Sequence, residues 1–296
     1  MLKSFLLFLV LFFLNACSQS CVKLEHVIKK ECDYYALRSA ECLNTQSLIK
    51  RLEPYPVIFV GDHHSEANMH LKVAELITAL ANNGTKVLLA NEWFYPSDKK
   101  VLNAFVRNDI NESEFITKIQ WAKRLKYYPY ESFKPMYESV KQRGGELYGI
   151  NISKSEQKQI SDDNTSSMNQ EIFSLYKALD TNVSAHQNLV MPFLSHCHAP
   201  KKEESLKECT QRMYKVQVAW DTKMARESAN LARHLKKNEK LIVFAGSMHM
   251  EYHLGIPLRF ARESNLPYLN IIPAATGTKS IPHGIGDFIL FYQAKE

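Results

Sequence analysis

Several features of common protein classes are missing from this sequence. Beyond its first sixteen residues the 296-residue chain has no run of about 18 apolar residues, the length that a membrane-spanning helix needs. Its six cysteines include no CxxC pair, and His196-Cys197-His198 is too tight for all three side chains to bind one tetrahedral zinc ion. The net charge of +6 is spread out, with Lys201 and Lys202 followed at once by Glu203 and Glu204. We see no basic stripe of the kind that nucleic-acid binding needs, although a mildly positive surface suits a ligand that carries carboxylates.

The first sixteen residues have the pattern of a signal peptide. Lys3 supplies a positive charge, and Phe5 to Leu14 form an apolar run of ten residues, which is too short to cross a bilayer. The run ends in Leu14-Asn15-Ala16-Cys17, which resembles the bacterial lipobox. We therefore expect residues 1–16 to be removed and Cys17 to carry a lipid anchor, such as palmitate, with a retained apolar helix as the alternative. Ser18 after the cysteine favours the outer membrane over retention at an inner one.

The remaining cysteines are consistent with export. Without Cys17 five are left, and their spacing makes Cys32–Cys42 and Cys197–Cys209 plausible local disulfides, with Cys21 left over.

Apolar runs bounded by glycine, proline or asparagine alternate with helical patterns along the chain. The helical stripe between residues 62 and 82 joins the first two strands into a β-α-β unit, so the pair is parallel with a right-handed crossover. The predicted class is α/β, with a parallel sheet flanked by helices. The predicted strands are 57–61, 86–91, 146–151, 240–245, 268–272 and 288–292, the last two at the sheet edge.

The same pattern suggests the division of the chain into parts. We expect a signal peptide over 1–16, a lipidated and partly helical segment over 17–45, and one α/β domain over 46–296. Helical segments of about 100–140 and 165–205 should form a smaller helical lobe.

Two strand exits share one motif. Each is a buried strand followed by GxxH: Gly61-Asp62-His63-His64 and Gly246-Ser247-Met248-His249. Ligands of open parallel sheets bind outside the carboxyl ends of the strands, where the next exits add Glu92, Trp93, Asn151 and Lys154. His64, Glu92 and His249 could hold a metal for hydrolysis, whereas tyrosine and lysine point to haem iron and its propionates. Spacing leaves both readings open.

A family resemblance favours the second reading. The Gly61–His64 motif, His70, Glu92, Trp121, Asn151 to Lys154, Gln217 to Ala225 and Gly246 to Pro257 occur in the order found in the ChaN family of the Tiki-like superfamily. Members are iron-regulated lipoproteins implicated in haem uptake. The resemblance implies a homodimer that encloses two stacked haems, each iron being bound by a tyrosine of one subunit and the propionates by a histidine and a lysine of the other. Asp62 stands where the family usually has Glu, which weighs against the metalloprotease chemistry of other superfamily members.

Individual residues follow from that resemblance. Tyr252, inside the second motif, is the first choice of iron ligand, followed by Tyr130 and Tyr148. Lys154 and His198 are the expected propionate contacts, His198 being preferred over His196 and His186. The predicted function is therefore a non-catalytic haem-binding lipoprotein. Its expected partners are haem, a second copy of the chain and an outer-membrane haem receptor. The alternative is a metal-dependent hydrolase that uses His64, Glu92 and His249.

Overall fold

The computed structural model describes residues 21–24, 32–197 and 200–295. The predicted signal peptide, the lipidated Cys17 and the candidate His198 lie outside these ranges. Among the described helices, none is long and apolar enough to cross a membrane.

An eight-stranded sheet forms the centre of the molecule, with the order β3-β2-β10-β8-β4-β7-β5-β6. Every pair from β10 to β6 is parallel, whereas β2 and β3 add two antiparallel strands at one side. A separate two-stranded sheet pairs β1 with β9. The strands are β1 (Cys21–Lys23), β2 (Tyr34–Ala36), β3 (Glu41–Leu43), β4 (Val57–Asp62), β5 (Lys86–Asn91), β6 (Glu146–Gly149), β7 (Glu239–Gly246), β8 (Tyr268–Ala275), β9 (Ser280–Pro282) and β10 (Phe288–Tyr292).

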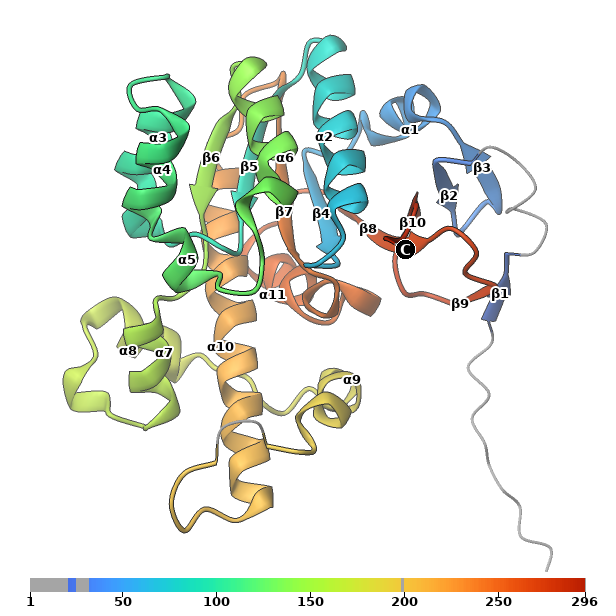
Figure 1. Ribbon diagram of the computed structural model, residues 1–296. Coiled ribbons are helices and arrows are strands. Elements are labelled where there is room, and N and C mark those ends of the chain that lie inside the picture. Colours follow the sequence, from blue (N-terminus) through green and yellow to red (C-terminus); the bar gives the residue numbers. More distant parts are fainter. Residues whose placement is uncertain (1–20, 25–31, 198–199, 296) are drawn as a thin grey trace, which may run out of the picture.

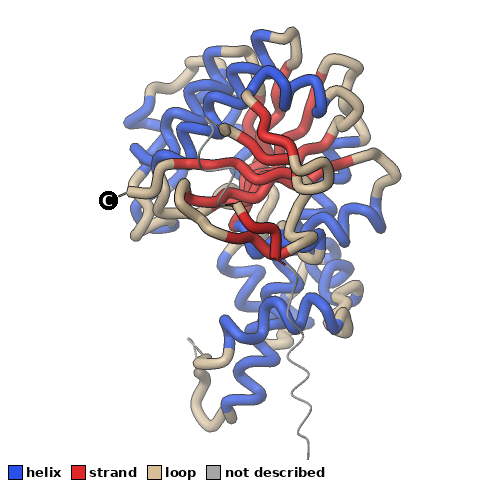
Figure 2. Tube along the Cα trace, turned by 90° about the vertical axis from the view of Figure 1, so that its right-hand side faces the viewer, coloured by secondary structure: helices blue, strands red, loops and turns tan. Residues whose placement is uncertain are grey.

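Both faces of the sheet are buried, which explains the continuous apolar runs of the central strands. Successive side chains of a strand point to opposite faces, so Ile58 and Val60 of β4 enter one core and Val57 and Phe59 the other. Helices cover the two faces, as Figures 1 and 2 show, so the predicted α/β class is confirmed. The first core is completed by α1 (Thr45–Leu52), α2 (Ala67–Asn82), α3 (Lys99–Val106), α4 (Glu112–Ile119), α5 (Trp121–Arg124) and α6 (Tyr130–Gln142), and the second by α10 (Leu206–Ala232) and α11 (Ile256–Glu263).

The helical lobe lies below the carboxyl ends of the strands in Figure 1. It is built around the first half of α10, which packs with α7 (Lys154–Ser161), α8 (Gln170–Lys177) and α9 (Ser184–Leu194) in two small apolar clusters. With 27 residues α10 is roughly 40 Å long, enough to serve both the lobe and the sheet. The helices of residues 100–140 share the core of the sheet and are not part of the lobe, whose described helices are α7, α8, α9 and the first half of α10.

Two expectations about the sheet were wrong. The described part of residues 17–45 before α1 contains the short strands β1, β2 and β3 rather than helix. Because β2 pairs with β10, the strands at 268–275 and 288–292 lie inside the sheet and not at its edge. Strands of three residues are too short to show a period in the sequence.

Disulfides join Cys32 to Cys42 and Cys197 to Cys209, the two pairs that the sequence favoured. The first lies at the sheet side formed by β2 and β3, and the second ties the loop before α10 to that helix. Cys21 belongs to neither pair.

Candidate functional site

The two GxxH exits meet at the carboxyl edge of the sheet because β4 and β7 are parallel neighbours. A Cβ atom added at Gly246 would lie 2.9 Å from Cε1 of His64, so the imidazole rests directly against the glycine backbone. The centroid of the His64 ring is 4.5 Å from that of Trp93 and 5.3 Å from that of Tyr128. The edge therefore carries a compact aromatic group around His64.

His64 is hydrogen-bonded to a buried carboxylate. Its Nδ1 lies 2.8 Å from Oδ2 of Asp62, and Nε2 of His70 lies 2.7 Å from Oδ1 of the same carboxylate. Burial alone would raise the pKa of Asp62, but the hydrogen bonds from both histidines hold it below its usual value. The pKa of His64 is raised: burial opposes the charge, and the hydrogen bond to Asp62 outweighs it together with the nearby Glu92.

His249 is held in the same way from another part of the chain. Its Nδ1 lies 2.5 Å from Oδ1 of Asp221, a fully buried residue of α10. Nε2 of His186 in α9 lies 3.1 Å from Oδ2 of Asp221, outside the hydrogen-bonding direction, while its Nδ1 bonds to the hydroxyl of Tyr214 at 2.9 Å. Each motif histidine thus contacts a buried aspartate that also contacts a second buried histidine.

Glu92 lies between the two motifs. Its Oε2 accepts a hydrogen bond of 2.8 Å from the backbone N–H of Gly246, and Oε1 is 3.5 Å from Nε2 of His249. Burial would lower the pKa of His249, but the carboxylates of Glu92 and Asp221 raise it to about 10. His249 thus lies between two carboxylates, with Nδ1 facing Asp221 and Nε2 facing Glu92.

His64, Glu92 and His249 do not bring three ligand atoms within 4.8 Å of one another in the structure. In the described part of the chain, only Cys197, Glu204 and Cys209 bring three possible ligand atoms within 4.8 Å of one another. The two cysteines of that group form a disulfide, and a disulfide lacks the thiolates that bind metals.

The structure places the three predicted tyrosines apart. Tyr252 follows the second motif with a left-handed backbone (φ 55°), and its N–H donates to the carbonyl of Ile285, before β10. Tyr130 is buried in the first core and its hydroxyl has no hydrogen-bond partner. Tyr148 donates its hydroxyl to Glu146 on β6. No described hydrogen bond or ring contact joins any of the three to His64, Glu92 or His249.

The expected propionate contacts have different surroundings. Lys154 begins α7 with an exposed side chain just beyond β6. His198 lies outside the described residues, and its neighbour His196 is exposed. His186 is fully buried against Asp221, which removes it from any surface role.

Several residues of the site were not found from the sequence. Asp221 and Gln217, which lies 3.0 Å from Nδ1 of His249, stood in the family-like segment without an assigned role. Arg259 of α11, whose Nη1 lies 3.8 Å from Oδ2 of Asp221, and Tyr128 carry no motif, and the sequence suggested His186 only as a propionate contact. No sequence pattern identifies these residues, and only the fold brings them to the strand ends.

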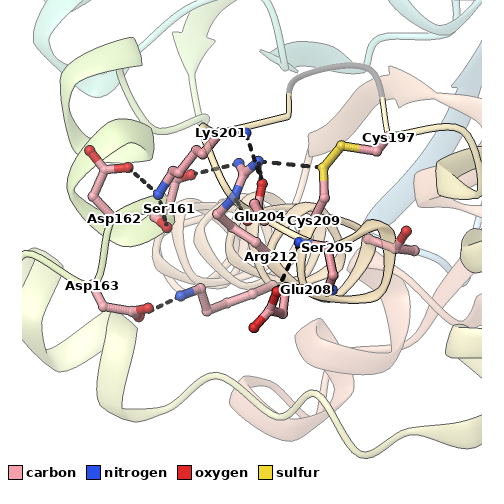
Figure 3. A network of polar contacts seen from close by, with 12 residues as sticks. Ser161, Asp162, Asp163, Cys197, Lys201, Glu204, Ser205, Glu208, Cys209 and Arg212 are labelled. Atoms are coloured by element: carbon pink, nitrogen blue, oxygen red, sulfur yellow. Dashed lines mark hydrogen bonds and ion pairs between the residues drawn. A yellow bond between two sulfur atoms is a disulfide. The ribbon is translucent and has the colours of Figure 1, made fainter.

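A cavity of about 710 Å³ lies in the lobe, partly lined by the residues of Figure 3. Its cations are already paired: Arg212 bonds to Glu204 at 2.7 and 2.8 Å, Lys201 lies 2.7 Å from Asp162, and Lys215 contacts Asp163. Such a balanced lining offers no free positive charge to a ligand that carries carboxylates, which favours the carboxyl edge over this cavity.

The rim of the carboxyl edge has a different character. Residues 125–128 form a turn next to Trp93, in which Tyr127 is 79% exposed and the half-buried Tyr128 faces His64. The ammonium of Lys126 is 5.4 Å from the centroid of the Tyr127 ring. Aromatic surface, a phenol and a cation are the groups that suit a flat apolar macrocycle with carboxylates and a ferric ion.

The comparisons with known proteins concern the family and the fold. The family model described as haem-binding uptake, Tiki superfamily, ChaN matches residues 48–260. A ChaN of Campylobacter jejuni with cofacially bound haem has a similar fold, with a TM-score of 0.68 and 18% identity over 88% of this chain and 96% of that one. The type III effector HopBA1 is also similar, with a TM-score of 0.52 and 15% identity over 85% of this chain and 94% of the effector. No curated protein matches. The resemblance seen in the sequence is confirmed: this chain belongs to the ChaN family of haem-binding uptake proteins.

Proposed function

We propose that the protein is a non-catalytic, haem-binding lipoprotein of haem and iron acquisition. The family match over residues 48–260 carries this proposal. The site supports it in two ways. The motif histidines are engaged with carboxylates, as a structural role requires, and the rim next to them presents aromatic rings and a lysine to solvent.

Tyrosine ligation is part of the proposal. A bound haem supplies an iron centre, and a phenolate oxygen stabilises its ferric state because the ligand is anionic. Such a site suits carriage of haem more than oxygen binding. The chain's own residues would bind and orient the macrocycle at the carboxyl edge, with exposed lysines such as Lys154 and Lys126 near the propionates.

Haem should also drive assembly. Two stacked haems between two copies of the chain would bury macrocycle surface that stays partly exposed to solvent in a monomer. We expect the apo-protein to be monomeric and the haem-loaded protein to be dimeric. Sedimentation velocity with and without haemin measures this, and a monomer at saturating haem would contradict the shared site.

Titration of the purified protein with haemin tests haem binding itself. We expect a Soret band with high-spin charge-transfer features and saturation at one haem per chain. Metal analysis of the same protein before titration tests the hydrolase alternative, which requires a stoichiometric metal. A bound metal with no haem spectrum would overturn the proposal.

Cys17→Ser tests the anchor. Because the substituted protein lacks the thiol that carries the acyl chains, we expect it to leave the membrane fraction and to incorporate no radiolabelled palmitate. Fractionation of outer membranes from cells that express the unsubstituted protein tests the localisation.

A further inference from the structure

A group of possible metal ligands lies in the helical lobe, away from the strand exits. Ligand atoms of Cys197, Glu204 and Cys209 all lie within 4.8 Å of one another, where the end of α9 meets the start of α10 (Figure 3). The two cysteines form a disulfide in this structure. Their sulfur atoms are thiols in the newly synthesised chain and again after reduction by a dithiol, so the group has a second state with different chemistry.

The spacing of the two cysteines suits a shared metal ion. Zinc–sulfur bonds of about 2.3 Å at a roughly tetrahedral angle place two thiolates of one site about 3.8 Å apart. The Cα atoms of Cys197 and Cys209 are 5.9 Å apart, so rotation of the side chains is enough to separate the sulfur atoms to that distance. Glu204 supplies a third ligand, because zinc binds carboxylate oxygen as well as thiolate sulfur.

The backbone around this group has supports other than the disulfide. A capping box of Ser205 and Glu208 fixes the start of α10. The helix α9 packs against α10 in an apolar cluster that contains Val190 and Tyr214. The three ligands should therefore stay close together when the cysteines are thiols.

Arg212 supplies the charge that such a site needs. Its Nη2 donates to Sγ of Cys209 at 3.5 Å, and its Nε and Nη2 donate to the carboxylate of Glu204 at 2.7 and 2.8 Å. The hydrogen bonds from Arg212 and from the backbone N–H of Lys201 lower the pKa of Glu204 to about 2, which keeps this ligand ionised. Two thiolates and a carboxylate leave a divalent cation with one excess negative charge, which the guanidinium neutralises. Groups that hydrogen-bond to metal ligands orient them in the same way.

We propose that Cys197, Cys209 and Glu204 bind a soft divalent cation such as Zn²⁺ when the cysteines are thiols. Binding of the ion releases the two thiol protons and leaves the oxidation state of sulfur unchanged. Disulfide formation instead removes two electrons and two protons, which reduce a disulfide of an exchange partner to a dithiol. Both reactions use the same sulfur atoms, so the bound ion and the disulfide exclude each other.

The other disulfide provides an internal control. Sγ of Cys32 lies 3.0 Å from the carbonyl oxygen of Tyr34. Among the described residues, no histidine or carboxylate completes a group of three ligand atoms with Cys32 and Cys42. We therefore expect this pair to form a disulfide and no metal site.

The test titrates Co²⁺, a spectroscopic substitute for Zn²⁺, into the full chain after reduction with a phosphine and removal of the reductant without oxygen. We expect one equivalent to give a sulfur-to-cobalt charge-transfer band and the intense visible bands of a tetrahedral site, and Zn²⁺ to bleach both. The oxidised protein should give neither. Cys197→Ser should lose the bands, whereas Cys32→Ser should keep them.

Two adjacent glutamates form a matched pair for the third ligand. Glu204→Gln should lower the Co²⁺ affinity at least about tenfold, since even changes to groups that hydrogen-bond to ligands cost about 10–100-fold. Glu203→Gln should leave the affinity unchanged, because Glu203 is exposed and is not part of the group. Unfolding of both variants in the oxidised state checks that each is folded before reduction.

Zn²⁺ should also protect one pair of cysteines selectively. We expect oxidised glutathione to convert Cys32 and Cys42 to a disulfide in the presence of Zn²⁺ while Cys197 and Cys209 remain thiols, as alkylation and mass spectrometry would show. Equal oxidation of the two pairs contradicts the exclusion of the disulfide by the ion.

The remaining outcomes are equally decisive. A reduced protein without cobalt bands, or bands that persist in Cys197→Ser or in the oxidised protein, overturns the site. Equal Co²⁺ affinities of Glu204→Gln and Glu203→Gln overturn the ligand set. No haem is present in these assays, so their failure leaves the proposed function untouched.

Discussion

The two GxxH exits have the same sequence pattern and different environments. The side chain of His64 is 30% exposed and binds Asp62, which is two residues away in its own segment. The side chain of His249 is 8% exposed and binds Asp221, which comes from the long helix that links the lobe to the sheet. One histidine is thus held by local geometry and the other by a tertiary contact. A shared motif therefore identifies a shared position in the fold but not a shared chemical state.

Removal of the second aspartate should be the most damaging change. Asp221→Ala leaves the His249 imidazolium buried with only Glu92 nearby, and breaking a buried pair costs about 3–5 kcal/mol. Asp62→Ala also removes the partner of the fully buried His70, but it should cost less, because water can reach the more exposed His64. Denaturant unfolding measures both. Asp180→Ala, which removes an exposed partner of Arg262, is the control and should cost less than about 1 kcal/mol. Equal losses at Asp62 and Asp221 would remove the distinction between the two exits.

The pH dependence of the free energy of unfolding should reflect the titration of His249. Its pKa of about 10 in the folded state lies above the value of about 6.5 expected for the unfolded chain. The resulting contribution to the free energy of unfolding is complete below about pH 6.5 and is lost as the pH rises through about 10. Unfolding between pH 6 and pH 10 should therefore show a decline that is reduced in His249→Gln. By NMR, His249 should titrate at higher pH than His64, and the reverse order would contradict the assigned environments.

A substitution at Gly246 tests the close approach of the two strand exits. In Gly246→Ala the new methyl group meets the ring of His64, and overpacking of this kind costs about 1–3 kcal/mol. In a His64→Ala background the same change should cost much less, because the ring is gone. A double-mutant cycle measures the difference, and additive costs would show that the two exits do not contact each other.

The smallest effect is expected at the residue before His64. Nδ1 of His63 lies 2.7 Å from the hydroxyl of Tyr292, at the end of β10. Tyr292→Phe removes this hydrogen bond at a cost of about 0.5–1.5 kcal/mol, since His63 is partly exposed and water can replace the hydroxyl. Thermal unfolding detects the change. A loss as large as that of Asp221→Ala would mean that the first exit also depends on distant contacts.

Much of the fold could be predicted because its signals are local. The runs at 86–91 and 288–292 coincide with β5 and β10, and 57–61 differs from β4 by one residue. The first predicted helix begins later than expected, at Ala67, because residues 63–66 turn away from the strand. The strands β2 and β3 were missed because each depends on pairing with β10 and its neighbour rather than on its own pattern.

The candidate site was predictable only in part. The strand exits identified His64, Glu92 and His249, since parallel strands bring their carboxyl ends to one edge whatever the loops do. The roles of these residues were not predictable from the motif. Two histidines of the same motif have the same letter in the sequence, and the difference between them lies in their carboxylate partners and in their burial.

The sequence by itself determined the α/β class, the family and the edge where the site lies, because strand periodicity and motif order are properties of neighbouring residues. Tertiary structure decided which partners surround each side chain. It buried Tyr130, turned Tyr252 toward the β9–β10 connection and left Tyr127 open on its turn. Exposure and charge state depend on atoms that are distant along the chain, and only packing brings those atoms together.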